Sequence, residues 1–121
     1  MNGKPTPLWL TRAMAKSEAE RETERKIMLR REYHQQTACI HWHQLQTYYA
    51  HGNVICVAQE LDLVEVAVQL GMDNTECFQS WIAAEQIAGV SGEQALTWYD
   101  TNRELWAVVA APWVLVQQRD A

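Results

Sequence analysis

Three residues near the middle of the chain, Cys39, His41 and His43, alternate in sequence, and their side chains are the usual ligands of zinc. Residues two apart share one face of a strand, which would place three metal donors together. Structural zinc sites, however, take their ligands from two separated segments, and the sequence has no CxxC pair. His43 also falls in a helical pattern. We therefore predict no metal site, with His41 in solvent.

Two carboxylates, Asp62 and Glu65, form the next candidate, because paired carboxylates perform acid–base chemistry. Their spacing is also that of a capping box, in which a short acceptor precedes the residue that reaches back by three positions. No nearby histidine, lysine or arginine completes a catalytic set. The sequence therefore favours a structural role for Asp62 as a helix cap, worth about 1 kcal/mol.

Other catalytic signatures are absent from the sequence. None of the five glycines forms a phosphate-cradling loop. The serines Ser17, Ser80 and Ser91 fall in a linker, a helix and a cap, and no base accompanies them. Cys56 lies in an apolar strand pattern, which indicates a buried, unreactive thiol. We predict no catalytic residue, no cofactor and no enzymatic activity.

Six tryptophans are many for 121 residues, and five of them lie after residue 40. Tryptophan stacks on nucleic-acid bases or anchors protein interfaces. Most should lie in the core, because a small body needs large apolar side chains to bury enough area. We assign Trp106 and Trp113 to a partner-binding surface, because a strand beside the break at Pro112 would lie at a sheet edge.

The first 26 residues form a basic arm with an apolar tip. On a helix, four apolar side chains at i, i+4 spacing would make a short stripe suited to docking in a groove of a protein partner: Trp9, Leu10, Ala13 and Met14. A membrane-surface helix and an inert tail are the alternatives. From Lys16 to Lys26 the only apolar residue is Ala19, which predicts a solvated helix or a disordered linker.

Helix signals recur through the rest of the chain. Three capping boxes open apolar runs: Asp62 with Glu65, Asp73 with Glu76, and Ser91 with Gln94. Gly71 and Gly89 stand where left-handed residues are expected to end helices. These signals predict helices at about 63–70, 74–88 and 92–101. An earlier helix at about 41–51 should stop at Gly52.

Two segments are typical of β-structure, a short one at 53–58 and a long one at 105–117. Pro112 either divides the long segment into two strands or sits at an edge or bulge. Its nearly continuous apolar character predicts a strand covered on both faces. We predict an α+β fold with about four helices packed on a small two- to three-stranded β-sheet, preceded by an N-terminal helical arm. The expected domains are the arm, 1–26, and the body, 27–121.

Charge is divided between these parts. Residues 1–38 hold eight basic and five acidic side chains, a net +3, whereas residues 39–121 hold two and ten, a net −8. An acidic body repels phosphate backbones, so nucleic-acid binding through it is not expected. No apolar run approaches the roughly 18 residues of a membrane span. The three cysteines are widely spaced and odd in number, which indicates reduced thiols.

The body resembles a known family through several of its segments. These are Trp42, Leu45, Ala50 and Gly52, then LDLVEVA at 61–67, Trp81, the segment 90–98, and LWAVVAAPWVLVQ at 105–117 with its distinctive APWVLVQ ending. The family consists of small proteins of proteobacteria and cyanobacteria with a domain of unknown function, and it is matched over about residues 27–118. The resemblance implies no activity, substrate or cofactor. The basic arm and the histidines beside Trp42 depart from the family pattern.

These observations predict a small, cytoplasmic, non-enzymatic accessory or adaptor protein. The acidic body would dock on a protein partner or on a second copy of the chain, and the basic arm would make a second contact. The alternative is a small-molecule or cofactor-binding domain with a tryptophan-lined pocket. An adaptor should expose an apolar patch, whereas a ligand-binding domain should enclose an apolar cavity with converging polar groups.

Overall fold

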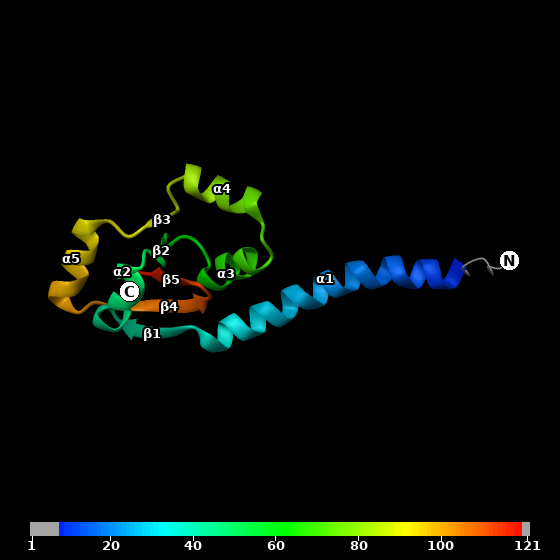
Figure 1. Ribbon diagram of the computed structural model, residues 1–121, viewed down its shortest axis with the longest axis horizontal. Coiled ribbons are helices and arrows are strands. Elements are labelled where there is room, and N and C mark those ends of the chain that lie inside the picture. The colour runs from blue at the N-terminus through cyan, green and yellow to red at the C-terminus, as the bar shows by residue number, and fades with distance from the viewer. Residues whose placement is uncertain (1–7, 120–121) are drawn as a thin grey trace.

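The computed structural model describes the backbone of residues 8–119 and the side chains of residues 19–119 (Figure 1). These residues form a long helix followed by an α+β body, which confirms the predicted class. In chain order the elements are α1 (Leu8–Gln36), β1 (Ala38–His41), the 3-10 helix η1 (Trp42–Leu45), α2 (Gln46–Ala50), β2 (Val54–Val57), α3 (Leu63–Gly71), α4 (Thr75–Ala83), β3 (Ile87–Gly89), α5 (Gly92–Thr101), β4 (Glu104–Ala110) and β5 (Trp113–Gln117).

The sheet is mixed and its strand order is β1-β4-β5-β2-β3. Strands β2 and β5 run parallel, while the other neighbouring pairs are antiparallel. The described residues contain five strands, so the expected two to three were wrong. The two unexpected strands, β1 and β3, are only four and three residues long. Both lie at sheet edges, where pairing with a neighbour rather than an apolar pattern fixes their conformation.

Both faces of the sheet are covered, as the apolar run at 105–117 predicted. Along β4, Leu105 and Ala107 face a cluster with Trp42 and Trp98, under η1, α2 and α5. The alternate residue Val108 faces the other cluster, under α3, and both clusters are nearly free of solvent. Alternation of side chains along the strand puts the two sets on opposite faces. Pro112 lies in the turn between β4 and β5, and the Ala111–Pro112 bond is cis.

The helix caps follow the sequence in two of three places. The Asp62 carboxylate accepts from Val64 N at 3.0 Å, and the Ser91 hydroxyl accepts from Gln94 N at 3.1 Å. The expected Asp73 cap was wrong, because Asn74 is the N-cap and accepts from Cys77 N at 3.2 Å. Asp73 instead adopts a left-handed conformation with φ of 55° and completes the turn from α3 to α4.

The glycines fulfil one expectation out of three. Gly52 is left-handed, with φ of 74°, and ends the second helical region as predicted. Gly71 and Gly89 are not left-handed; the positive φ angles after α4 and α5 belong to Glu85 and Asn102. Glu85 therefore stops the helix expected at 74–88 well before residue 88. The chain that follows it becomes β3.

Helix α1 is continuous through residue 26 and, at 29 residues, extends for about 43 Å. Its N-terminal half projects away from the body (Figure 1). The Lys16–Lys26 stretch is thus helical, and residues 19–25 are exposed. Nearer the body, Arg25 Nη2 donates to Gly71 O at 3.0 Å and Arg30 pairs with Glu65 on α3. Within the described residues, no helix is both long and apolar enough to cross a membrane.

Gly71 lets α1 approach α3 closely. A Cβ at this position would lie 3.1 Å from both Leu29 Cδ1 and Tyr33 Oη, which is tighter than ordinary side-chain contact. Gly71 does not form the left-handed helix end that the sequence predicts. Its lack of a side chain instead leaves room for Leu29 and Tyr33 of α1, a helix about 40 residues earlier in the chain.

Candidate functional site

An apolar groove lies between α4 and the margin of the sheet formed by β2 and β3. We call it the α4 groove; it has a volume of about 720 Å³ and is open to solvent. Trp113, at the start of β5, is one of its lining residues. The other lining residues come from the loop before β2, from β2, from α4, and from the turn and strand that follow it: Gly52, Val54, Ile55, Phe78, Ile82, Glu85, Ile87, Ala88 and Gly89.

Local structure explains why this groove is apolar and unfilled. Phe78 and Ile82 are four residues apart, so they stand on one side of α4. Phe78 also packs edge-on against Trp81 at 5.4 Å, which ties α4 to the core, while Ile82 remains 56% exposed. Gly89 offers no side chain, and a Cβ built on it would meet nothing within 4 Å. The groove therefore has a fixed apolar floor and an open side at β3.

A smaller hollow lies on the opposite face of β3, against α5. Its volume is about 210 Å³, and we call it the α5 hollow. It shares Glu85, Ala88 and Gly89 with the α4 groove, since those residues belong to β3 or precede it. The remaining lining is more polar than that of the groove: Cys56, Ala58, Gln86, Val90, Ser91 and Gln94. Strand β3 is thus flanked by an apolar depression on one face and by a smaller depression of mixed polar and apolar lining on the other.

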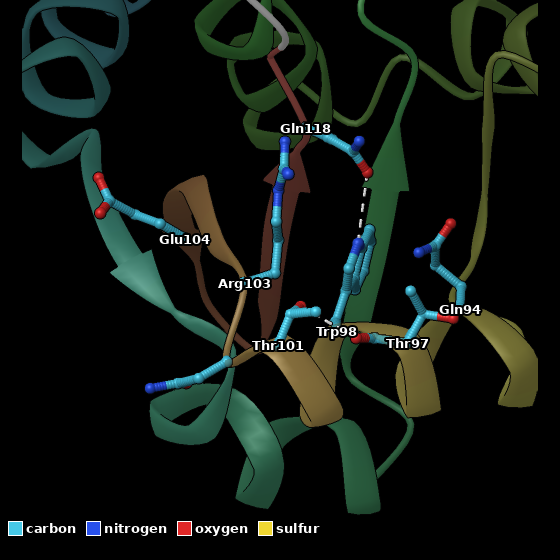
Figure 2. Close-up of a pocket in the computed structure, with 8 residues that line it drawn as sticks. Gln94, Thr97, Trp98, Thr101, Arg103, Glu104 and Gln118 are labelled. Carbon is cyan, nitrogen blue, oxygen red and sulfur yellow. Dashed lines mark hydrogen bonds between the residues drawn. The ribbon is translucent and has the colours of Figure 1, made fainter.

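A third depression, between α5 and the start of β4, is polar and about 610 Å³ in volume (Figure 2). The Trp98 indole Nε1 donates to Gln118 Oε1 at 3.3 Å across its wall. The Thr97 and Thr101 hydroxyls donate to helix carbonyls at 3.0 Å, so both are already engaged in hydrogen bonds within α5. Arg103 and Glu104 point apart in this view. The arrangement suits hydrogen bonding to a polar group rather than nucleophilic chemistry.

The two tryptophans assigned to partner binding are not brought together. Trp113 lines the α4 groove, and its assignment to partner binding stays a prediction. Trp106 packs on the α3 side of the sheet, and the Arg119 guanidinium covers its ring at 4.8 Å. Their ladder partners, Ala110 for Trp113 and Gln117 for Trp106, lie at opposite ends of the β4–β5 pair. The expectation that these strands form a sheet edge was wrong, because β4 and β5 are interior strands.

The predicted docking residues of the arm lie in the N-terminal part of α1. The side chains of this group fall outside the described part of the chain: Trp9, Leu10, Ala13 and Met14. Their assignment to partner binding therefore stays a prediction.

The Cys39–His41–His43 set is divided between two elements. His41 ends β1, where its Nε2 lies 3.7 Å from Glu104 Oε2 and both side chains are exposed. His43 lies in η1, and its Nε2 is 2.8 Å from the Tyr99 carbonyl oxygen. Among residues with described side chains, no group of three or more His, Cys, Asp or Glu is placed to hold a metal ion.

Three thiol and carboxyl groups with described side chains have shifted pKa values, and none of the three shifts activates a nucleophile. Burial raises the pKa of the Cys56 thiol, which keeps it protonated at neutral pH. The pKa of Cys39 is also raised, chiefly by desolvation and then by its hydrogen bond with Glu104. The pKa of Glu65 is lowered, first by the hydrogen bond from Gln69 and then by Arg30. Glu65 thus serves as an ionic contact between α1 and α3.

Acidic side chains dominate the sequence that builds the groove. From residue 39 to residue 102 there are eight aspartates and glutamates and no lysine or arginine. Glu85 lines both the α4 groove and the α5 hollow. A partner with positive charge beside its apolar contacts is therefore favoured electrostatically.

Most residues of the α4 groove were not predicted from the sequence. Phe78, Ile82, Ile87 and Gly89 had all been placed in or just after one long helix, which hid the turn at Glu85. The available signal was the pair of β-branched residues Ile87 and Val90 around Ala88 and Gly89, a composition that favours a strand over a helix.

The fold and its depressions define a class of protein: a small α+β domain with an apolar groove at its sheet margin and a long N-terminal helix. The chain belongs to the family described as "Protein of unknown function (DUF2288)", whose model matches residues 28–118. The expected family of unknown function over about residues 27–118 is confirmed.

The chain is also similar to PA1075 of Pseudomonas aeruginosa, whose structure was solved by NMR in solution. The two are 39% identical, with a TM-score of 0.65, over 70% of this chain and 79% of that one. No curated protein matches the sequence significantly.

Proposed function

We propose that this is a non-enzymatic accessory or adaptor protein that binds a protein partner through the α4 groove. The observation that carries the proposal is an open apolar groove lined by Trp113 and by the exposed Ile82, set in an acidic domain. Exposed apolar surface rimmed by polar residues marks interaction sites. Tryptophan is among the side chains that dominate binding energy at such sites.

The charge division of the chain supports a protein partner. The acidic body is unsuited to nucleic acid, because it would be repelled by phosphate groups. The basic arm supplies a second contact of opposite character, through Trp9, Leu10, Ala13 and Met14. The projecting α1 helix separates the arm contact from the body contact. The protein can therefore bind one extended partner surface or two different partners. The proposed location is the cytoplasm, where the three cysteines stay reduced.

A substitution in the groove tests this function. Ile82→Asp places a charge on the rim and should abolish capture of partner proteins from the native host. Leu96→Asp is the matched control, because Leu96 is also an exposed helical residue, 62% accessible, and lines none of the depressions described here. Quantitative mass spectrometry of captured proteins is the measurement. Equal capture by both variants and the unmodified protein would refute the role of the groove.

The arm is tested in the same way. Trp9→Ala combined with Leu10→Ala should reduce capture of the same partner. Ile27→Ala combined with Met28→Ala is the control, since these two residues are exposed apolar side chains on the same helix, nearer the body. Unchanged capture by the Trp9 and Leu10 double variant would assign binding to the body alone.

The second candidate function is binding of an apolar small molecule in the α4 groove. Its volume falls within the roughly 300–1,000 Å³ of ligand sites, and its lining is mainly apolar. Native mass spectrometry of gently purified protein distinguishes the two functions. A stoichiometric small-molecule adduct lost on Trp113→Ala, with no captured protein, would favour this candidate.

A further inference from the structure

We propose that the outer edge of β3 receives an extended peptide as a sixth strand, and that this peptide alternates apolar and basic side chains. The inference rests on the proposed function, since it specifies how the α4 groove is occupied. A peptide that adds a strand gains affinity from main-chain hydrogen bonds and specificity from pockets for alternate side chains. Both requirements are met at β3.

The register of β2 and β3 determines which backbone groups of β3 point away from β2. Ala58 N donates to Gln86 O at 2.8 Å, and Cys56 lies opposite Ala88. In an antiparallel pair, hydrogen-bonded positions alternate, so Ala88 directs its amide and carbonyl groups toward β2. Ile87 and Gly89 then direct theirs away from β2. Among the described residues, β3 is the last strand of the sheet and has no neighbour on that side.

In an antiparallel pair, every second residue of a strand exchanges its N–H and C=O hydrogen bonds with the same neighbour. An added strand would therefore pair with the backbone groups that β3 directs away from β2. The edge is short, so the added strand pairs over about three residues. The edge is accessible at Gly89, which is exposed and has open space around it, whereas Ile87 is only 4% exposed. Gly89 is therefore the position at which an added strand gains its backbone hydrogen bonds. In Figure 1, β3 lies at the margin of the sheet between α4 and α5.

Side-chain specificity follows from the two depressions on either face of β3. Successive side chains of an added strand point to opposite faces of the sheet. One set enters the α4 groove, where Ile82 and Phe78 favour an apolar side chain. The other set faces the α5 hollow, whose lining is mixed: Cys56 and Val90 offer apolar contact to a side-chain stem, and Gln94, Ser91 and Glu85 offer polar groups to its end. The expected pattern is therefore apolar and polar in alternation.

Charge selects basic residues for the polar positions. Glu85 is shared by both depressions, and residues 39–102 supply eight acidic and no Lys or Arg side chains. A cationic peptide gains attraction from this surface, whereas an anionic one is repelled. The other edge of the sheet, β1, lacks the flanking depressions: its residues line none of the three described above. β3 is therefore the edge with side-chain sites.

The test uses a blocked seven-residue peptide of alternating lysine and valine, titrated into the full chain at low salt and followed by NMR. The amide signal of the exposed Gly89 should shift and its hydrogen exchange should slow. A peptide with glutamate in place of lysine should bind at least about tenfold more weakly. N-methylation of the valine amides, which removes the donors of the peptide without changing the protein, should also weaken binding by about tenfold or more.

Two variants of the protein complete the test. Gly89→Pro removes the outward amide, and proline is tolerated on an edge strand whose N–H faces solvent. Gly89→Ala keeps the amide and is the matched control, because an added Cβ meets nothing within 4 Å. The proline variant should bind the lysine–valine peptide about tenfold more weakly than the alanine variant. If the proline variant fails to fold, the N-methylated peptide carries the comparison.

Several results would overturn the inference. Absence of binding by the lysine–valine peptide would do so, as would binding that is indifferent to both N-methylation and Gly89→Pro. If peptide binding is indifferent to both changes but Ile82→Asp still abolishes partner capture, the proposed function survives. The α4 groove is then occupied by a helix or loop of the partner. A different result is that the protein dimerises, with shifted amide signals at Gly89, while the Trp9→Ala, Leu10→Ala double variant stays monomeric. That result would assign the α4 groove to the arm of a second copy.

Discussion

Replacement of Gln117 by methionine should destabilise the body by about 2–4 kcal/mol. Gln117 closes the APWVLVQ segment and is 1% exposed, the most buried polar side chain described. Its Nε2 donates to Ala58 O at 2.8 Å and to Leu61 O at 2.7 Å, and its Oε1 accepts from Arg119 Nε at 2.7 Å. These bonds fasten the turn between β2 and α3 to the end of β5.

The magnitude follows from what each carbonyl keeps after the substitution. Methionine has a similar length and volume but no donor. Ala58 O retains its bond from Leu61 N at 3.1 Å, so losing the second bond costs about 0.5–1.5 kcal/mol. Leu61 O loses the donor that satisfies it, which costs about 1–3 kcal/mol. For a domain of this size the sum lowers the melting temperature by roughly 10 °C.

The assay is equilibrium unfolding in denaturant, followed by circular dichroism and by tryptophan fluorescence. Arg119→Met is the control: it removes the bond to Gln117 Oε1 and the contact with Trp106 but leaves both carbonyl bonds intact. The control should cost about 1 kcal/mol or less, because the Arg119 side chain is largely exposed. A loss below about 1 kcal/mol for Gln117→Met would refute the reasoning, since the carbonyls would then have found other partners.

Three further predictions concern the helices. Asp62→Asn should be nearly neutral in thermal unfolding, whereas Asp62→Ala should cost about 0.5–2 kcal/mol through loss of the cap on α3; equal effects would contradict the capping role. Deleting residues 1–18 should leave the melting temperature almost unchanged, while Leu29→Ala, at the α1–α3 contact, should lower it by several degrees; a large loss on deletion would mean that the arm packs on the body. Because the pKa of Glu65 is lower in the folded than in the unfolded chain, ionised Glu65 stabilises the fold above about pH 4.3. This stabilisation is lost as the pH falls through the folded-state pKa. Glu65→Gln should therefore make the free energy of unfolding depend less on pH in the acid range, as measured by pH-dependent unfolding.

Part of this structure follows from local chemistry alone, and the sequence determined that part. Asp62 and Ser91 cap helices because a short acceptor satisfies amides two or three residues away, whatever the rest of the chain does. Gly52 ends a helix because glycine tolerates a positive φ. Pro112 divides the final apolar run because it cannot donate to a ladder. The same run, apolar at nearly every position, indicated a sheet covered on both faces.

The remaining features depend on residues far apart in sequence, and only the tertiary structure decided them. β1 and β3 are strands because a neighbour pairs with them, not because their own residues demand it. The parallel pairing of β2 with β5 makes β5 an interior strand and places Trp106 and Trp113 at opposite ends of one pair. The α4 groove exists because Glu85 turns the chain and Gly89 leaves space beside Ile82. Local propensities in water are worth about 1 kcal/mol or less per residue, so the burial of a shared core overrides them wherever the two disagree.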